Sequence, residues 1–250
     1  MSLFNEKLKD IQLNEVLVVI VVLFLIQLIL NSLNIIHFDS IFIDIFLIFY
    51  FIFKLKDNLP DKNDFSEVFA GDLLKYILVI VVLNVFLSYG FLYLSNYLLE
   101  IFPPLSFISG YNVSDSIMAL GVLATIFLSP IVEELLFRGV FYNRLKIIVP
   151  TLFSVLISSL LFASLHSYGS VISAFIFGLC MSILYIKTDN ILVPMFAHFL
   201  NNLLAEIIVV MDPTHIIFTN DTVIITISIL AIVSFVIISN FLIKELNNLK

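Results

Sequence analysis

Charged residues are scarce in this chain of 250 residues, of which 12% are charged and 61% are hydrophobic. A soluble domain of this length needs far more charge to cover its surface. The low charge, with a mean hydropathy of +1.15, therefore excludes an ordinary soluble globular protein. It predicts an all-α polytopic membrane protein with about eight transmembrane helices.

The sequence lacks several other features, and each absence excludes a kind of structure or function. Cys180 is the single cysteine, so an intramolecular disulfide is impossible. No cluster of basic residues resembles a nucleic-acid patch, and we expect no nucleic-acid partner. No small-residue cleavage site follows the apolar run at residues 16–30, which predicts an uncleaved first transmembrane helix. Without a visible repeat or soluble module, residues 1–250 are expected to form a single membrane domain.

Tryptophan is also absent, whereas phenylalanine occurs 26 times and isoleucine, leucine and asparagine are frequent. This composition suggests an AT-rich genome and favours a bacterial source. We therefore expect a multi-pass protein of the bacterial cytoplasmic membrane, with the lipid bilayer as its surroundings.

Apolar runs recur along the chain, and a spanning helix needs about 20 such residues. They predict eight helices, near residues 14–36, 40–54, 73–98, 115–147, 150–168, 170–187, 190–211 and 220–243. The fourth is too long for one straight span, because at about 1.5 Å per residue it would reach roughly 50 Å. We expect it either to project into the cytosol or to break near Ser129-Pro130, since proline removes a helical hydrogen bond.

Basic residues are distributed unevenly between the connections of these helices. With the N-terminus inside, all 12 Lys and Arg residues fall on, or toward, one side of the membrane. The opposite loops carry only acidic charges, at Asp39, Glu100, Asp115, Asp212 and Asp221. Because Lys and Arg accumulate in cytoplasmic loops, both termini are predicted to be cytosolic.

A Glu-Glu pair and an arginine lie inside the fourth apolar segment, where charged side chains are costly and usually functional. Glu134 and Arg138 are four residues apart and can pair on one helix face. Glu133 projects about 100° away from Glu134. It is therefore left free to face a cavity, where a carboxylate could take a proton from water.

Two histidines lie in later apolar segments. If the fourth and fifth helices form a hairpin that turns near Pro150, Glu133 lies 17 residues before the turn and His166 lies 16 after it. Their side chains are then expected at similar depth. His198 and Asn202 are four residues apart on the seventh segment and share a face, where both could donate hydrogen bonds to an oxyanion.

These motifs resemble those of the CPBP family of intramembrane proteases, which includes CAAX proteases and bacteriocin-processing enzymes and is also called the Abi family. The resemblance covers roughly residues 115–205, the expected catalytic core. It rests on Glu133-Glu134…Arg138, Phe162…His166 and His198…Asn202. It implies a glutamate-dependent endopeptidase that cuts a peptide or membrane-protein substrate. The implied roles are water activation by Glu133 and His166, oxyanion stabilisation by His198 and Asn202, and support by Glu134, Arg138 and Phe162.

Some alternatives remain open at the level of sequence. A glutamate and two histidines can bind zinc, but the chain has no HExxH motif, so we expect no metal and no cofactor. Each motif could also be purely structural, as an interfacial ion pair, a histidine at a helix end or an interhelical hydrogen bond. The alternative function is a non-catalytic membrane partner, such as a bacteriocin-immunity protein or a sensor-kinase scaffold.

Overall fold

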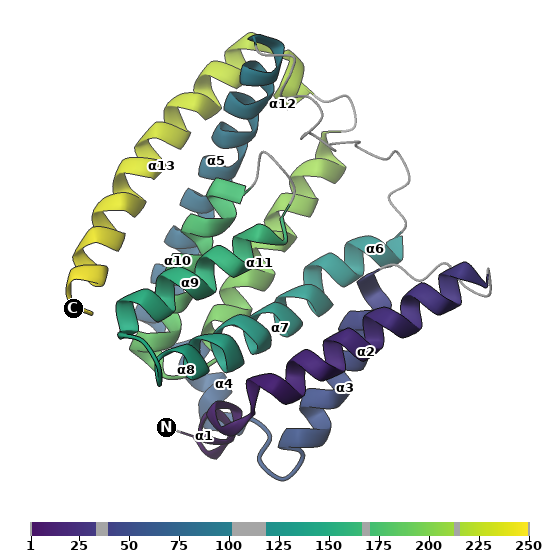
Figure 1. The fold of residues 1–250 in the computed structure, drawn as a ribbon. Coiled ribbons are helices and arrows are strands. Elements are labelled where there is room, and N and C mark those ends of the chain that lie inside the picture. The colour runs from purple at the N-terminus through teal and green to yellow at the C-terminus, as the bar shows by residue number, and fades with distance from the viewer. Residues whose placement is uncertain (1, 34–39, 102–118, 167–170, 213–215, 250) are drawn as a thin grey trace.

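The computed structural model describes residues 2–33, 40–101, 119–166, 171–212 and 216–249. Every regular element within these ranges is a helix, and none of these residues forms a strand. The predicted all-α class is therefore confirmed. The chain forms a helical bundle, in which successive long helices cross the molecule (Figure 1).

A helix occupies each of the eight apolar segments. These helices are α2 (Leu13–Ser32), α3 (Ser40–Leu55), α5 (Gly71–Ile101), the run from α6 to α8, α9 (Thr151–Ser164), α10 (Val171–Thr188), α11 (Leu192–Met211) and α13 (Asp221–Asn247). Three short helices outside these segments were not predicted: α1 (Leu3–Asp10) before the first segment, and α4 (Lys62–Val68) and α12 (Ile216–Thr219) in the connections. A capping box between Asp61 and Asp64 explains the start of α4, because it satisfies backbone donors at that end of the helix.

Five of the described helices are long and apolar enough to cross a membrane, namely α2, α5, α10, α11 and α13. The protein is therefore a multi-pass membrane protein. Helix α9 is apolar but has only 14 residues, which is about 21 Å of helix against a hydrocarbon core of about 30 Å. The count of eight spans stays a prediction.

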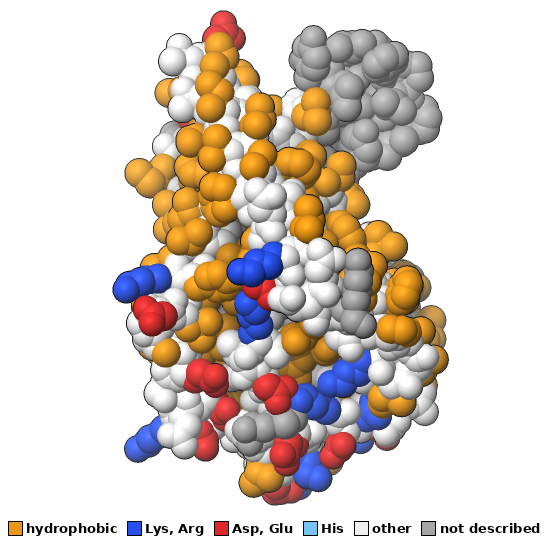
Figure 2. All heavy atoms as spheres, turned by 90° about the vertical axis from the view of Figure 1, so that its left-hand side faces the viewer, with side chains coloured by type: hydrophobic (Ala, Val, Ile, Leu, Met, Phe, Trp, Pro, Cys, Tyr) orange, Lys and Arg blue, Asp and Glu red, His pale blue; other side chains and the backbone are white. Residues whose placement is uncertain are grey.

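Charged side chains are unevenly distributed over the surface. Lys and Arg gather over the lower part of the face in Figure 2, whereas hydrophobic side chains dominate its upper part. Glu15 pairs with Lys54, and Lys187 pairs with Glu245, each at 2.6 Å. Of the acidic residues assigned to the opposite loops, Asp39 and Asp115 lie outside the described residues. The orientation of the termini stays a prediction.

The predicted fourth helix follows one continuous course, but it is not uniformly α-helical. It consists of α6 (Ala119–Leu123), the π-helix η2 (Ala124–Leu128), α7 (Ser129–Glu134), the π-helix η3 (Leu135–Tyr142) and α8 (Asn143–Leu145). The predicted residues 115–118 lie outside the described part of the chain. The alternative of a break near Ser129-Pro130 was wrong. Pro130 lies in the first turn of α7, and the wider π-turn before it accommodates the missing proline N–H.

The predicted hairpin between the fourth and fifth helices is present. Helix α9 begins directly after Pro150 and packs against η3. The Ser158 hydroxyl donates a hydrogen bond to the Phe137 carbonyl at 2.7 Å. This bond uses a carbonyl within the π-helical segment and fixes α9 beside it.

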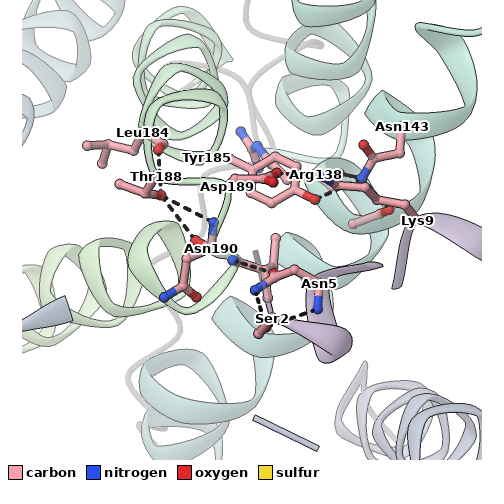
Figure 3. Close-up of polar contacts among 12 residues, drawn as sticks. Ser2, Asn5, Lys9, Arg138, Asn143, Leu184, Tyr185, Thr188, Asp189 and Asn190 are labelled. Atoms are coloured by element: carbon pink, nitrogen blue, oxygen red, sulfur yellow. Dashed lines mark hydrogen bonds and ion pairs between the residues drawn. The ribbon is translucent and has the colours of Figure 1, made fainter. Parts of the chain in front are cut away.

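A polar cluster fastens α1 to the turn between α10 and α11 (Figure 3). The Asn5 side-chain oxygen accepts the backbone N–H of Ile191 at 3.0 Å, and Lys9 pairs with Asp189 at 2.6 Å. Asp189 has a φ of 51°, the left-handed conformation that reverses the chain there. Asp residues tolerate this conformation better than most.

Asn143 closes the C-terminal end of η3 in the same region (Figure 3). Its side-chain amide donates to the carbonyls of Arg138 at 3.0 Å and Gly139 at 2.8 Å. It also contacts the Tyr185 hydroxyl at 2.9 Å. Together these bonds stabilise the end of the irregular helix that carries the Glu-Glu pair and link it to α10.

Candidate active site

A fully buried ion pair lies at the centre of the three motifs. Arg138 donates from Nη1 to Oε1 of Glu134 at 3.0 Å, and both side chains are 0% exposed. The predicted pairing of these two residues is confirmed. Because removal of either partner would leave an uncompensated buried charge, the pair is expensive to break.

Two other groups hold the Arg138 guanidinium. Its Nη2 donates to the Gly178 carbonyl at 2.8 Å, and its carbon lies 4.6 Å from the centre of the Phe162 ring, within cation–π range. A Cβ at Gly178 would lie 3.1 Å from Ser159 Cβ and 3.2 Å from Nη2 of Arg138. Glycine therefore lets α10 approach the arginine closely enough to accept this bond.

His198 joins the ion pair from α11. Its Nδ1 lies 2.9 Å from Oε1 of Glu134, the same oxygen that accepts from Arg138. Because a carboxylate accepts hydrogen bonds, Nδ1–H is the donor, and Glu134 sets the orientation of the imidazole. The contact spans 64 residues of sequence, and the motif spacing did not predict it.

Glu133 lies on the other side of this imidazole. Its Oε2 is 3.8 Å from Nε2 of His198, and its side chain is 26% exposed, against 0% for Glu134. Oε2 has no hydrogen-bond partner among the described residues. The two carboxylates therefore differ in environment, as their angular separation predicted.

Phe162 separates and supports the two histidines. Its ring centre lies 4.7 Å from that of His166 and 5.7 Å from that of His198. Nδ1 of His166 lies 3.0 Å from the Phe162 carbonyl. Since a carbonyl can only accept, Nδ1–H is the donor and Nε2 keeps its lone pair for another partner. Within the described residues, no hydrogen bond or ion pair joins His166 directly to Glu133.

Asn202 lies one turn beyond His198 and contacts the helix of the Glu-Glu motif. Its Nδ2 donates to the Thr125 carbonyl in η2 at 2.9 Å, and its Oδ1 accepts from Asn201 at 3.4 Å. Within the described residues, the second Nδ2 hydrogen has no acceptor. The site thus offers one carboxylate, two imidazole nitrogens and one amide donor, which are groups suited to acyl transfer.

Several polar residues near the site were not among the residues predicted from sequence. Asp44, in the second apolar segment (α3), accepts a hydrogen bond at Oδ2 from the Ser129 hydroxyl at 3.2 Å. Asn84 and Asn201 also connect to Asn202. Their position within apolar segments is the signal that could have identified them, because polar groups in a membrane rarely occur without a role.

Zinc was the open alternative for the glutamate and two histidines. Within the described residues, no group of three or more His, Cys, Asp or Glu side chains has a geometry that could hold a metal ion.

Comparison with known proteins gives one match. Residues 115–204 match the family model "Type II CAAX prenyl endopeptidase Rce1-like". No curated protein and no solved structure matches the chain. The seven residues predicted for the site, from Glu133 to Asn202, all lie inside the matched segment. Over residues 115–204 this chain is therefore similar to the Rce1-like family of CAAX-type endopeptidases, the resemblance that its three motifs predicted.

Proposed function

We propose that this protein is a glutamate-dependent intramembrane endopeptidase that hydrolyses a peptide bond in a peptide or membrane-protein substrate. The observation that carries the proposal is the arrangement of His198 between two carboxylates. Glu134 orients the imidazole from one side at 2.9 Å, and Glu133 lies 3.8 Å from its other nitrogen. A purely structural ion pair would need neither the second carboxylate nor the histidine.

In the proposed first step, Glu133 and His166 activate a water. The water oxygen forms a bond to the peptide carbonyl carbon while one water proton moves to Oε2 of Glu133. Oε2 has no hydrogen-bond partner among the described side chains, and Nε2 of His166 is the acceptor that can hold the other water hydrogen. The tetrahedral intermediate then collapses, the C–N bond breaks, and Glu133 returns its proton to the leaving amine.

His198 and Asn202 would stabilise the oxyanion of that intermediate. Asn202 has one amide hydrogen on the Thr125 carbonyl and a second one to offer. His198 can donate from Nε2 when it carries both protons, since Nδ1–H stays on Glu134. Each donor of this kind is worth about 10²–10³-fold in kcat.

Glu134, Arg138 and Phe162 would act as supports. Arg138 neutralises Glu134, and Glu134 in turn orients His198. Phe162 contacts the guanidinium and both imidazoles. In the proposal none of these three side chains reacts with the substrate.

The proposed setting is the cytoplasmic membrane of a bacterium. Residues 1–250 would form one domain of eight spans, with residues 115–205 as its catalytic core and both termini in the cytosol. The one-sided distribution of Lys and Arg supports this orientation. The substrate would then be cut near the cytosolic side.

The test is a comparison of membrane peptides from cells that carry the wild-type protein, Glu133→Gln or His166→Ala. Both variants should abolish the cleavage products and leave the protein level unchanged. Glu206→Gln is a matched control, because Glu206 lies on α11 outside the site. Mass spectrometry identifies the cleaved sequence, which can then be synthesised with a fluorophore and a quencher. Normal cleavage by both site variants would contradict the proposal.

A non-catalytic role as a partner protein makes the opposite prediction for the same variant. If the protein acts by binding, Glu133→Gln should fully complement a deletion strain. The family match does not favour this alternative.

A further inference from the structure

Three asparagine side chains form a hydrogen-bonded chain between α5 and η2. Asn84, on α5, donates from Nδ2 to Oδ1 of Asn201 on α11 at 2.9 Å. Asn201 donates to Oδ1 of Asn202 at 3.4 Å, and Asn202 donates to the Thr125 carbonyl at 2.9 Å. All three bonds run in the same direction, so each amide polarises the next.

Asn84, the first residue of this series of hydrogen bonds, has its polar side chain buried in an apolar helix. Its side chain is 3% exposed, within a helix apolar enough to span a membrane. Its Oδ1 is buried and has no hydrogen-bond partner among the described residues. One bond to Asn201 does not offset the cost of burying a carboxamide whose oxygen stays unpaired. Packing alone therefore does not explain this residue, which also lies outside the matched segment 115–204.

The direction of the chain determines how the Asn202 amide faces. A carboxamide can rotate by 180° and exchange its oxygen for its NH₂ group. Because Asn84 donates to Oδ1 of Asn201, the NH₂ group of Asn201 is directed to Asn202. Asn202 then presents Oδ1 to Asn201 and NH₂ to the Thr125 carbonyl, which can only accept, so the two neighbours together fix the direction of its remaining N–H.

We propose that Asn84 is a positioning residue of the peptidase reaction and acts through Asn201 to fix the Asn202 amide as an oxyanion donor. The inference rests on the function proposed above. Asn84 contacts neither Glu133 nor a histidine among the described contacts, so its effect on the reaction passes through Asn202.

The experiment is a double-mutant cycle on the purified protein in liposomes of phosphatidylethanolamine and phosphatidylglycerol. The probe is the quenched fluorescent peptide identified from the membrane-peptide comparison. Asn84→Leu keeps the side chain near its size and removes the amide. We expect kcat to fall about 10-fold with KM unchanged, less than the full loss of one oxyanion donor at about 10²–10³-fold.

The decisive measurement is the same substitution in an Asn202→Ala background. If Asn84 acts through Asn202, Asn84→Leu causes no further loss of kcat there. A structural role would lower kcat by the same factor in both backgrounds. Asn240→Leu, in α13, is the matched control for placing leucine at an asparagine of an apolar helix. Should Asn84→Leu fail to accumulate, Asn201→Ala tests the same chain one residue closer to Asn202.

Two outcomes would overturn the inference: wild-type kcat in Asn84→Leu, or an equal loss with and without Asn202. Both are interpreted alongside Glu133→Gln. If Glu133→Gln is inactive while Asn84→Leu is unaffected, only the role of Asn84 fails. If Glu133→Gln cleaves the probe normally, the proposed function fails, and the role of Asn84 fails with it.

Discussion

Arg138 should be the most sensitive position in the protein when its charge is removed. Arg138→Met keeps most of the side-chain volume but takes away two hydrogen bonds, at 3.0 Å to Glu134 and 2.8 Å to the Gly178 carbonyl. It also removes the cation–π contact with Phe162 at 4.6 Å. Above all it leaves the carboxylate of Glu134 fully buried without its cation.

The magnitude follows from that uncompensated charge. Breaking a buried ion pair by removing one partner costs about 3–5 kcal/mol. For a chain of this size, 1 kcal/mol corresponds to about 2–4 °C in Tm, so we expect a fall of about 6–20 °C. The double variant Arg138→Met/Glu134→Gln should recover a large part of this loss, because the glutamine carries no charge to bury.

The protein supplies its own probe for this measurement. Cys180 is the single cysteine of the chain and its side chain is 1% exposed, so a fluorogenic maleimide labels it only when the bundle opens. Arg144→Met is the control, since Arg144 donates to the Ile11 carbonyl from a half-buried position and should cost less. A Tm for Arg138→Met equal to that of Arg144→Met, or a double variant no better than the single one, would refute the reasoning.

Two further predictions concern helix packing and the α10–α11 turn, and the same thiol assay measures both. A Cβ at Gly90 would clash with Cβ of Ala231, so Gly90→Ala should lower the Tm by pushing α13 away from α5. Ala231→Gly in the same chain should restore the Tm. No gain from the second substitution would argue against this contact. The free energy of unfolding of Asp189→Gly should lie within about 1 kcal/mol of the wild-type value. The partly exposed ion pair that it removes contributes little, and glycine readily adopts the positive φ of this position. Asp189→Val should lower the free energy of unfolding by about 1–2 kcal/mol more, because a β-branched residue disfavours positive φ. Equal stability of the two variants would show that the backbone conformation at residue 189 does not matter.

Local features of the protein were predictable from its sequence. Apolar runs predicted eight segments, each of which is helical in the structure, because a run of about 20 apolar residues has few other stable forms in lipid. The spacing of four residues predicted the pair of Glu134 with Arg138. The motifs predicted a resemblance to CAAX-type endopeptidases, which the match over residues 115–204 confirmed. Each of these inferences depends on neighbours within about one helical turn or on a pattern along the chain.

The irregular parts of the motif helix were not predictable in this way. Pro130 suggested a break, but the chain forms π-helical turns before and after α7 instead. Neighbouring groups stabilise the second of these, since Ser158 and Asn143 bond carbonyls of η3 from other elements. A π-turn is stable where side chains from other parts of the fold bond its displaced carbonyls. A short stretch of sequence does not show which side chains these will be.

The assembly of the site was decided by tertiary structure alone. His198 reaches Glu134 across 64 residues, and Asn84 reaches Asn201 across 117 residues. Lipid is as apolar as the helices themselves, so hydrophobic patterning does not indicate which helix faces pack together. Close approach at Gly178 and directional hydrogen bonds between helices select one arrangement. The amino-acid sequence by itself therefore determined the helices and the chemistry they carry, and only helix packing decided which polar groups meet.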